Sequence, residues 1–176
     1  MSIPAEARPG DFFVVRTHGT AADVICVATR SKYNHAGIYM PDPTYDYGTV
    51  GVPPTRCVEA APSGARLTSA DYGDDKILVS NFALTPSQRY ALCEVARGLI
   101  GTPYGWEDIV SIGALQYGIK PDFIRDRVEN SSYLICSQLV DEVYRRVGLH
   151  LFADGRLPMD VTPGDLGRRI ALGGVL

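Results

Sequence analysis

The sequence predicts an α+β domain in which an antiparallel sheet packs against helices. Short runs rich in β-branched and aromatic residues, bounded by Gly and Pro, occupy much of the first half of the chain. Segments whose apolar residues recur at helical spacing follow in the second half. Strands grouped before helices are typical of α+β folds.

Four segments have the composition of strands, and a short helix is expected between the first two. The first strand follows Pro9-Gly10, and the second ends at Pro41, where a Pro- and Gly-rich loop begins. The strands are expected over 11–16, 34–40, 55–61 and 76–84, the short helix over 21–30 and the loop over 41–54.

The next helix has a clear start signal. Thr85-Pro-Ser-Gln88 is a capping box with proline at the first helical position, and Gly101 ends the apolar periodicity that follows. A further helix over 105–117, a polar exposed loop over 120–132 and a helix from Cys136 to Gly148 are expected after it. The tail over 157–166 contains the Pro, Gly and Asp residues typical of a surface loop, and a last short element is expected after it.

Length and composition define a single domain and exclude several classes of function. The 176 residues fit one domain over 1–176, with no linker or internal repeat. A formal net charge of -3 argues against a nucleic-acid partner, which requires a basic surface. No apolar run approaches the roughly 18 residues that span a bilayer, so no integral membrane segment is expected. Composition indicates no particular oligomeric state.

The N-terminal ten residues lack an apolar core and are not a signal peptide. The chain is therefore expected to be cytoplasmic as made, so that any action outside the cell requires non-classical export or phage-associated release. The four cysteines show no CxxC pairing, and we interpret them as free thiols.

Cys136 lies at the start of its helix and on the apolar face of that helix. The partial positive charge of a helix N-terminus favours thiolate over thiol, so this is a suitable position for a nucleophile. The alternative is that Cys136 is a small buried hydrophobic residue, the common fate of a free cysteine.

A cysteine nucleophile requires a base and a third polar group that orients the base. His35 begins an apolar strand beside small residues, which allows a helix end to approach it, whereas His18 and His150 lie in turn-like contexts. Glu59 lies on the next strand, and strand alternation places it on the face opposite Val58 and Ala60. If the two strands pair, Glu59 reaches one ring nitrogen of His35 while the other faces the thiol.

Each of these residues also has a structural interpretation. His35 fits a half-buried strand histidine with a backbone partner, and Glu59 fits a solvated charge on an edge strand. A metal site formed by His35, Cys57, Glu59 and Cys136 matches no familiar ligand spacing. No metal and no cofactor are therefore expected.

Together, these residues resemble the NlpC-type cysteine peptidases, specifically their circularly permuted, papain-like branch. In the unpermuted family the cysteine precedes the histidine, whereas here His35 and Glu59 precede Cys136, which assigns the branch. The matching segments are 9–15, 35–39, 58–60, 100–105 and 134–140, which cover motifs along most of the chain.

The resemblance implies a permuted papain-like fold and a role for each matched residue. Cys136 is expected to be the nucleophile, His35 the base and then the acid, and Glu59 the group that holds the ring. Tyr104 matches the family's tyrosine, whose hydroxyl helps the cysteine N–H bind the oxyanion. The chain departs from the family pattern in the long segment between Tyr104 and Cys136 and in the apolar Ile135, both of which bear on substrate preference.

The expected activity is hydrolysis of an amide through a thioester acyl-enzyme, with a peptidoglycan stem peptide as substrate. Two alternatives remain open. The same thiol suits lipid or other acyl chemistry, as in the related lecithin retinol acyltransferase group, although the Ser137-Gln138 that follows the cysteine differs from that group. A catalytically idle structural or binding module, such as a phage or secretion component, is the other.

Overall fold

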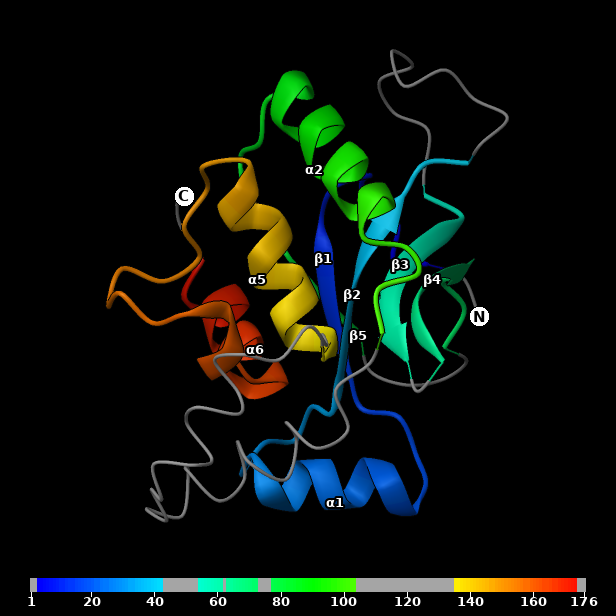
Figure 1. Ribbon diagram of the computed structural model, residues 1–176, viewed down its shortest axis with the longest axis vertical. Coiled ribbons are helices and arrows are strands. Elements are labelled where there is room, and N and C mark those ends of the chain that lie inside the picture. The colour runs from blue at the N-terminus through cyan, green and yellow to red at the C-terminus, as the bar shows by residue number, and fades with distance from the viewer. Residues whose placement is uncertain (1–2, 43–53, 62, 73–76, 104–134, 174–176) are drawn as a thin grey trace.

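A five-stranded antiparallel sheet, with strand order β4-β3-β2-β1-β5, lies at the centre of the computed structural model (Figure 1). The structure describes residues 3–42, 54–61, 63–72, 77–103 and 135–173. The strands are β1 (Phe12–Val15), β2 (His35–Met40), β3 (Arg56–Ala61), β4 (Gly64–Ser69) and β5 (Ile77–Val79).

Helices of the described residues cover one face of this sheet, and the predicted α+β class is confirmed. Helices α2 and α5 pack over β2, α5 also reaches β3, and α6 packs on β1 and β5 (Figure 1). Helix α1 lies across one end of the sheet (Figure 1). The helices are α1 (Thr20–Ala28), α2 (Pro86–Gly98), α5 (Cys136–Arg146) and α6 (Pro163–Leu172), with a short 3-10 helix η1 (Pro158–Asp160).

Strand alternation divides the buried side chains between the two faces. Ile38 and Val58 point toward the helices and pack with Leu139 of α5, within the larger core. Phe13 and Tyr39 belong to a smaller cluster on the other face. The site described below includes residues on this second face.

The strand predictions hold with two corrections. Strands β1, β2 and β3 lie within the predicted segments, but β4 was not predicted because Gly64–Ser69 is a half-polar edge strand with little apolar alternation. Strand β5 is shorter than the predicted 76–84, because the Ser80 hydroxyl accepts the Phe12 N–H at 2.9 Å and the chain then leaves the sheet.

The helix predictions hold with one correction. The Thr85 capping box forms as expected, and Gly148 adopts φ +80° after the end of α5. The tail is not a surface loop throughout, because Thr162 and Asp165 form a second capping box and the first turn of α6 is buried. The expected helix over 105–117 and loop over 120–132 lie outside the described residues, as does most of the loop over 41–54.

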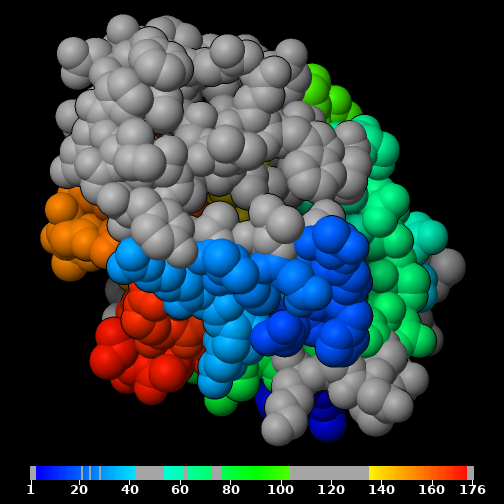
Figure 2. All heavy atoms as spheres, turned by 90° about the horizontal axis from the view of Figure 1, so that it is seen from below, coloured from blue at the N-terminus to red at the C-terminus, as the bar shows by residue number. Residues whose placement is uncertain are grey.

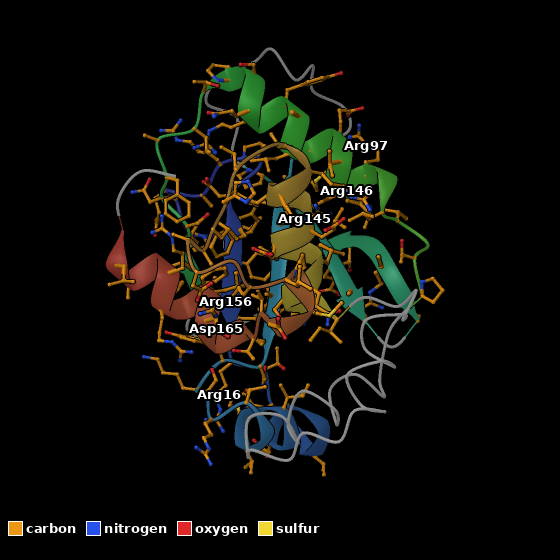
Figure 3. All side chains as sticks on the ribbon, turned by 60° about the vertical axis from the view of Figure 1, so that its left-hand side comes forward. Arg16, Arg97, Arg145, Arg146, Arg156 and Asp165 are labelled. Carbon is orange, nitrogen blue, oxygen red and sulfur yellow. The ribbon has the colours of Figure 1, made fainter. Side chains whose placement is uncertain are left out.

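Charged side chains form ion pairs at the end of α5 and at the start of α6. Arg145 and Arg146 lie in the last turn of α5 (Figure 3), where positive charge interacts favourably with the helix dipole. Both pair with Glu142. Asp165 at the start of α6 pairs with Arg156 at 2.9 Å (Figure 3). The first pairs lie within α5, and the second ties the segment between α5 and η1 to the start of α6.

The connection from α1 to β2 is held against α6 by close contacts at two glycines. A Cβ added at Gly164 would lie 2.8 Å from Ser31, and one at Gly167 would lie 2.6 Å from the Tyr33 ring. The surfaces of the two segments adjoin in the view from below (Figure 2). The chain is thereby fixed directly before His35. None of the helices in the described parts of the chain has the length and hydropathy needed to cross a membrane.

Gly37 gives a testable prediction about packing under the site. A Cβ at this position would lie 2.8 Å from the Phe13 ring and 3.0 Å from the Val58 carbonyl oxygen, and both groups are fully buried. We expect Gly37→Ala to lower the free energy of unfolding by about 1–3 kcal/mol in urea titrations. Gly98→Ala is the control, since nothing lies within 4 Å of its added Cβ. Equal stability of the two variants would contradict the packing argument.

Candidate active site

Glu59 lies in a row of residues that face each other across the sheet. It is directly opposite Gly37 on β2 and opposite Arg66 on β4. Facing residues of antiparallel strands project to the same side, so His35, two residues before Gly37, is a diagonal neighbour of Glu59. The predicted pairing of the two strands, with both side chains on one face, is what the structure contains.

His35 and Glu59 form a close pair. The His35 Nε2 lies 2.7 Å from Glu59 Oε2, and the side chains are 17% and 5% exposed. Since one ring nitrogen is engaged by the carboxylate, the other is left for a second partner. Glu59 is therefore a buried carboxylate that orients the ring, and the interpretation as a solvated edge charge is wrong.

Cys136 is the second partner of the ring. It is the first residue of α5, it is buried, and its interaction with His35 raises the pKa of the ring. The Cys136 Sγ also lies 3.9 Å from the backbone oxygen of Asn34, the residue before His35. The structure therefore brings together three of the four predicted site residues, Cys136, His35 and Glu59.

Asn34 fixes the start of β2 through its side chain. Its amide oxygen accepts from the N–H and hydroxyl of Thr17, and its amide nitrogen donates to the backbone oxygens of Thr17 and Ala22. The side chain of Asn34 is buried, and these bonds satisfy both of its polar groups. They tie the β1–α1 connection to the histidine strand beside Cys136.

Two contacts hold the first turn of α5 in place. The Ser137 hydroxyl donates to the Val161 oxygen at 2.6 Å, and Gln138 accepts the Ile135 N–H at 3.1 Å. Ile135 at the N-cap provides no side-chain cap. The backbone N–H groups of the first helical turn have no acceptor within the helix, and such a helix start favours a negatively charged group.

Glu59 has two further partners that sequence reasoning missed. Arg66 donates from Nε and Nη2 to Glu59 Oε1 at 3.0 and 2.8 Å. The hydroxyl of Tyr72 donates to Oε2, the oxygen that also contacts His35. Pro62-Ser63-Gly64 indicates a turn after Glu59 but not the pairing that brings Arg66 to it, and no local pattern indicates Tyr72.

The electrostatics of the pair favour its ionised form. Burial alone lowers the pKa of His35, but its hydrogen bonds with Cys136 and Glu59, and their charges, raise it to about 9. Burial raises the pKa of Glu59, and the hydrogen bond and charge of His35, with the bonds from Tyr72 and Arg66, lower it to about 2. At neutral pH the site therefore contains an imidazolium beside a carboxylate.

The other histidines and cysteines of the chain lie outside the Cys136–His35–Glu59 group. His18 and His150 are exposed, as expected, and Tyr104 lies outside the described residues. The cysteines of the chain are free thiols, as predicted. Cys57 shares the face of Glu59, and its sulfur contacts the Tyr72 hydroxyl at 3.7 Å.

The described residues do not form a metal-binding set. No group of three or more His, Cys, Asp or Glu side chains among them is placed to hold a metal ion. Both Glu59 oxygens are engaged by hydrogen-bond donors, and burial raises the pKa of the Cys57 thiol to about 12, which disfavours the thiolate that metals bind.

Comparisons with known proteins identify a fold likeness. No protein-family model and no curated protein matches the chain. Among solved structures, the crystal structure of metalloprotein yiiX from Escherichia coli O157:H7, DUF1105, is similar, with a TM-score of 0.59 at 19% identity. The match covers 93% of this chain and 82% of that chain, so the two proteins share a fold over nearly the whole of this chain.

Proposed function

We propose that the protein is a cysteine hydrolase that cleaves an amide bond through a thioester acyl-enzyme. The observation that carries the proposal is the arrangement Cys136–His35–Glu59, in which the ring is bonded to a buried carboxylate and a helix-terminal thiol lies beside the start of its strand. We further propose that the fold is the permuted papain-like arrangement of the NlpC-type peptidases, on the resemblance of the motifs and their order.

The site is suited to a thiolate–imidazolium pair. With a pKa of about 9, His35 holds its proton at neutral pH, and the adjacent Glu59 carboxylate balances its charge. The helix N-terminus favours a negative sulfur at Cys136. The thiolate is the nucleophilic form of cysteine.

In the proposed acylation step, the Cys136 sulfur attacks the carbonyl carbon, and the carbonyl electrons move onto oxygen. The resulting oxyanion accepts hydrogen bonds from backbone N–H groups at the start of α5. Tyr104, by its resemblance to the family's tyrosine, is the proposed second donor. His35 then gives its proton to the leaving nitrogen, the C–N bond breaks, and a thioester and a free amine result.

Deacylation reverses the role of the ring. Neutral His35 accepts a proton from water as the water oxygen attacks the thioester. Collapse of this second tetrahedral intermediate expels the Cys136 thiolate and releases a carboxylic acid. The imidazolium is restored beside Glu59, and the site returns to its starting state.

The substrate class that we propose is the stem peptide of bacterial peptidoglycan. It follows from the resemblance to the NlpC-type peptidases, several of whose motifs the chain contains in a consistent permuted order. Lipid ester hydrolysis or acyl transfer by the same thiol is the alternative within this chemistry.

Purified cell wall is the direct test. We expect wild-type protein to release muropeptides and Cys136→Ala to release none, because the substitution removes the sulfur that forms the thioester in the proposed reaction. Cys26→Ala, which removes a half-buried thiol from α1, is the matched control and should act like wild type. Equal release by wild type and Cys136→Ala would refute the proposal. Turnover of a lipid ester without muropeptide release would favour the acyl alternative.

A further inference from the structure

We propose that Arg66 and Tyr72 are positioning residues, which hold the Glu59 carboxylate ionised and fixed so that it keeps the His35 imidazolium beside Cys136. This inference rests on the proposed function only for the roles of Cys136 and His35. It assigns functional roles to two residues outside the resemblance.

The contacts of Glu59 leave its carboxylate little freedom. His35 and Tyr72 both donate to Oε2, while Arg66 donates twice to Oε1. The donors come from β2, from β4 and from the segment after β4. A carboxylate with donors on both oxygens from three segments can neither rotate nor turn away from the ring.

Arg66 is placed for this role by the sheet. It is the cross-strand partner of Glu59, so the short hairpin between β3 and β4 sets their spacing. Its side chain is 54% exposed, whereas that of Glu59 is 5% exposed. The guanidinium thus covers the solvent side of a carboxylate whose other contacts lie in the interior.

Tyr72 is placed by the packing of its ring. Its centroid lies 5.2 Å from that of Phe13 and 5.7 Å from that of His35. Burial, the charges of Cys57 and Glu59 and hydrogen bonds to both residues raise the pKa of the Tyr72 hydroxyl. The hydroxyl therefore keeps its proton at neutral pH and donates it to Glu59.

These two donors decide where the shared proton lies. Hydrogen bonds to an ionised carboxylate lower its affinity for a proton, so the proton between Glu59 and His35 stays on the ring. A protonated Glu59 would no longer stabilise the imidazolium, and the thiolate would form only at higher pH. If Arg66 and Tyr72 merely joined the strands, their loss would affect stability and not the protonation of the site.

The pH dependence of Cys136 alkylation separates these roles without any substrate. Iodoacetamide reacts with the thiolate, and peptide mapping by mass spectrometry assigns the modified cysteine. Cys57 and Cys93 do not interfere near neutral pH, because burial raises the pKa of each thiol to about 12. The acid-side midpoint of the rate profile reports the pH at which the thiolate forms.

We expect Arg66→Gln to move this midpoint upward by less than about one pH unit, because Arg66 contacts Glu59 and acts on Cys136 only through His35. Tyr72→Phe, which changes no charge, should move the midpoint in the same direction, and Arg66→Lys should give a smaller shift than Arg66→Gln. Arg56→Gln, which alters an exposed arginine of the neighbouring strand, is the control and should leave the midpoint unchanged.

Folded Arg66→Gln and Tyr72→Phe proteins with the wild-type midpoint would overturn the inference, whatever their thermal stability. Circular dichroism establishes that each variant is folded, and Arg66→Lys offers a second, milder change at the exposed position. A protein that alkylates with these shifts but releases no muropeptides would keep the inference and refute the proposed hydrolysis. The two claims are therefore tested separately.

Discussion

We expect His35→Ala to slow muropeptide release by about 10³-fold, the middle of the range for loss of a general acid–base group. Without the ring, the Cys136 thiol has to ionise without a neighbouring imidazolium, and the leaving nitrogen receives no proton from the enzyme. Both steps of the proposed reaction use this ring, so the rate loss should appear in kcat as well as in kcat/KM.

The alkylation rate of Cys136 provides a second measurement on the same variant. The rate of iodoacetamide reaction at pH 6 should fall sharply in His35→Ala, because the substitution removes the imidazolium beside the sulfur. His18→Ala and His150→Ala are matched controls, since both histidines are exposed and belong to no part of the proposed site. Retention of more than about a tenth of wild-type cleavage by folded His35→Ala would remove the ring from the mechanism.

The His35–Glu59 pair was predictable because two simple periodicities place it. Glu59 alternates with Val58 and Ala60, and it pairs with Gly37 across the two strands. Its carboxylate therefore lies on the same face as His35, two residues before Gly37. A slip of one residue would have placed Val58 on this face and left the ring without a partner. Burial on both sides of the sheet excludes such a slip.

Arg66 and Tyr72 could not be found in the same way. Strand β4 has an exposed, half-polar pattern that resembles a loop, so its pairing with β3 becomes visible only once the hairpin is formed. Tyr72 reaches Glu59 from the segment that follows β4, and no spacing in the sequence encodes that return. Contacts made by irregular segments depend on tertiary packing and leave no periodic signal.

The start of α6 differs from these contacts, because the sequence does contain a helix-start signal there. Thr162-Pro163-Gly164-Asp165 has the same form as the Thr85 capping box, which was recognised. Proline and glycine together are typical of a loop, and they obscured the cap. In the structure the proline occupies the first helical turn, and Gly164 permits close packing against Ser31.

The ionised pair also predicts how stability depends on pH. The pKa of Glu59 falls from 4.5 to about 2 on folding, so its contribution is complete above pH 4.5 and is lost as pH falls through 2. The pKa of His35 rises from 6.5 to about 9, so its contribution is complete below pH 6.5 and is lost as pH rises through 9. The pair therefore stabilises the fold most between pH 4.5 and 6.5.

We expect the difference in unfolding free energy between wild type and Glu59→Gln to be greatest in that window. Each shift corresponds to about 3 kcal/mol, an upper bound on the His35–Glu59 interaction, because Cys136 also raises the pKa of His35 and Tyr72 and Arg66 also lower that of Glu59. Urea titrations from pH 4 to pH 9 measure the difference. It should be constant from pH 4.5 to pH 6.5 and then decline toward pH 9, without reaching zero, because the bonds from Arg66 and Tyr72 to Glu59 persist after His35 loses its proton.

A surface carboxylate supplies the control that isolates the histidine. Glu94→Gln removes one partner of an exposed ion pair with Arg97 on α2, which is worth at most about 1 kcal/mol and involves no imidazole. The stability difference for this variant should therefore show no decline between pH 6.5 and 9. A decline confined to Glu59→Gln assigns the titration to His35, since both variants retain the other histidines. A difference for Glu59→Gln that stays constant through this range would mean that His35 is neutral in the folded protein, and the imidazolium on which the proposed chemistry depends would be absent.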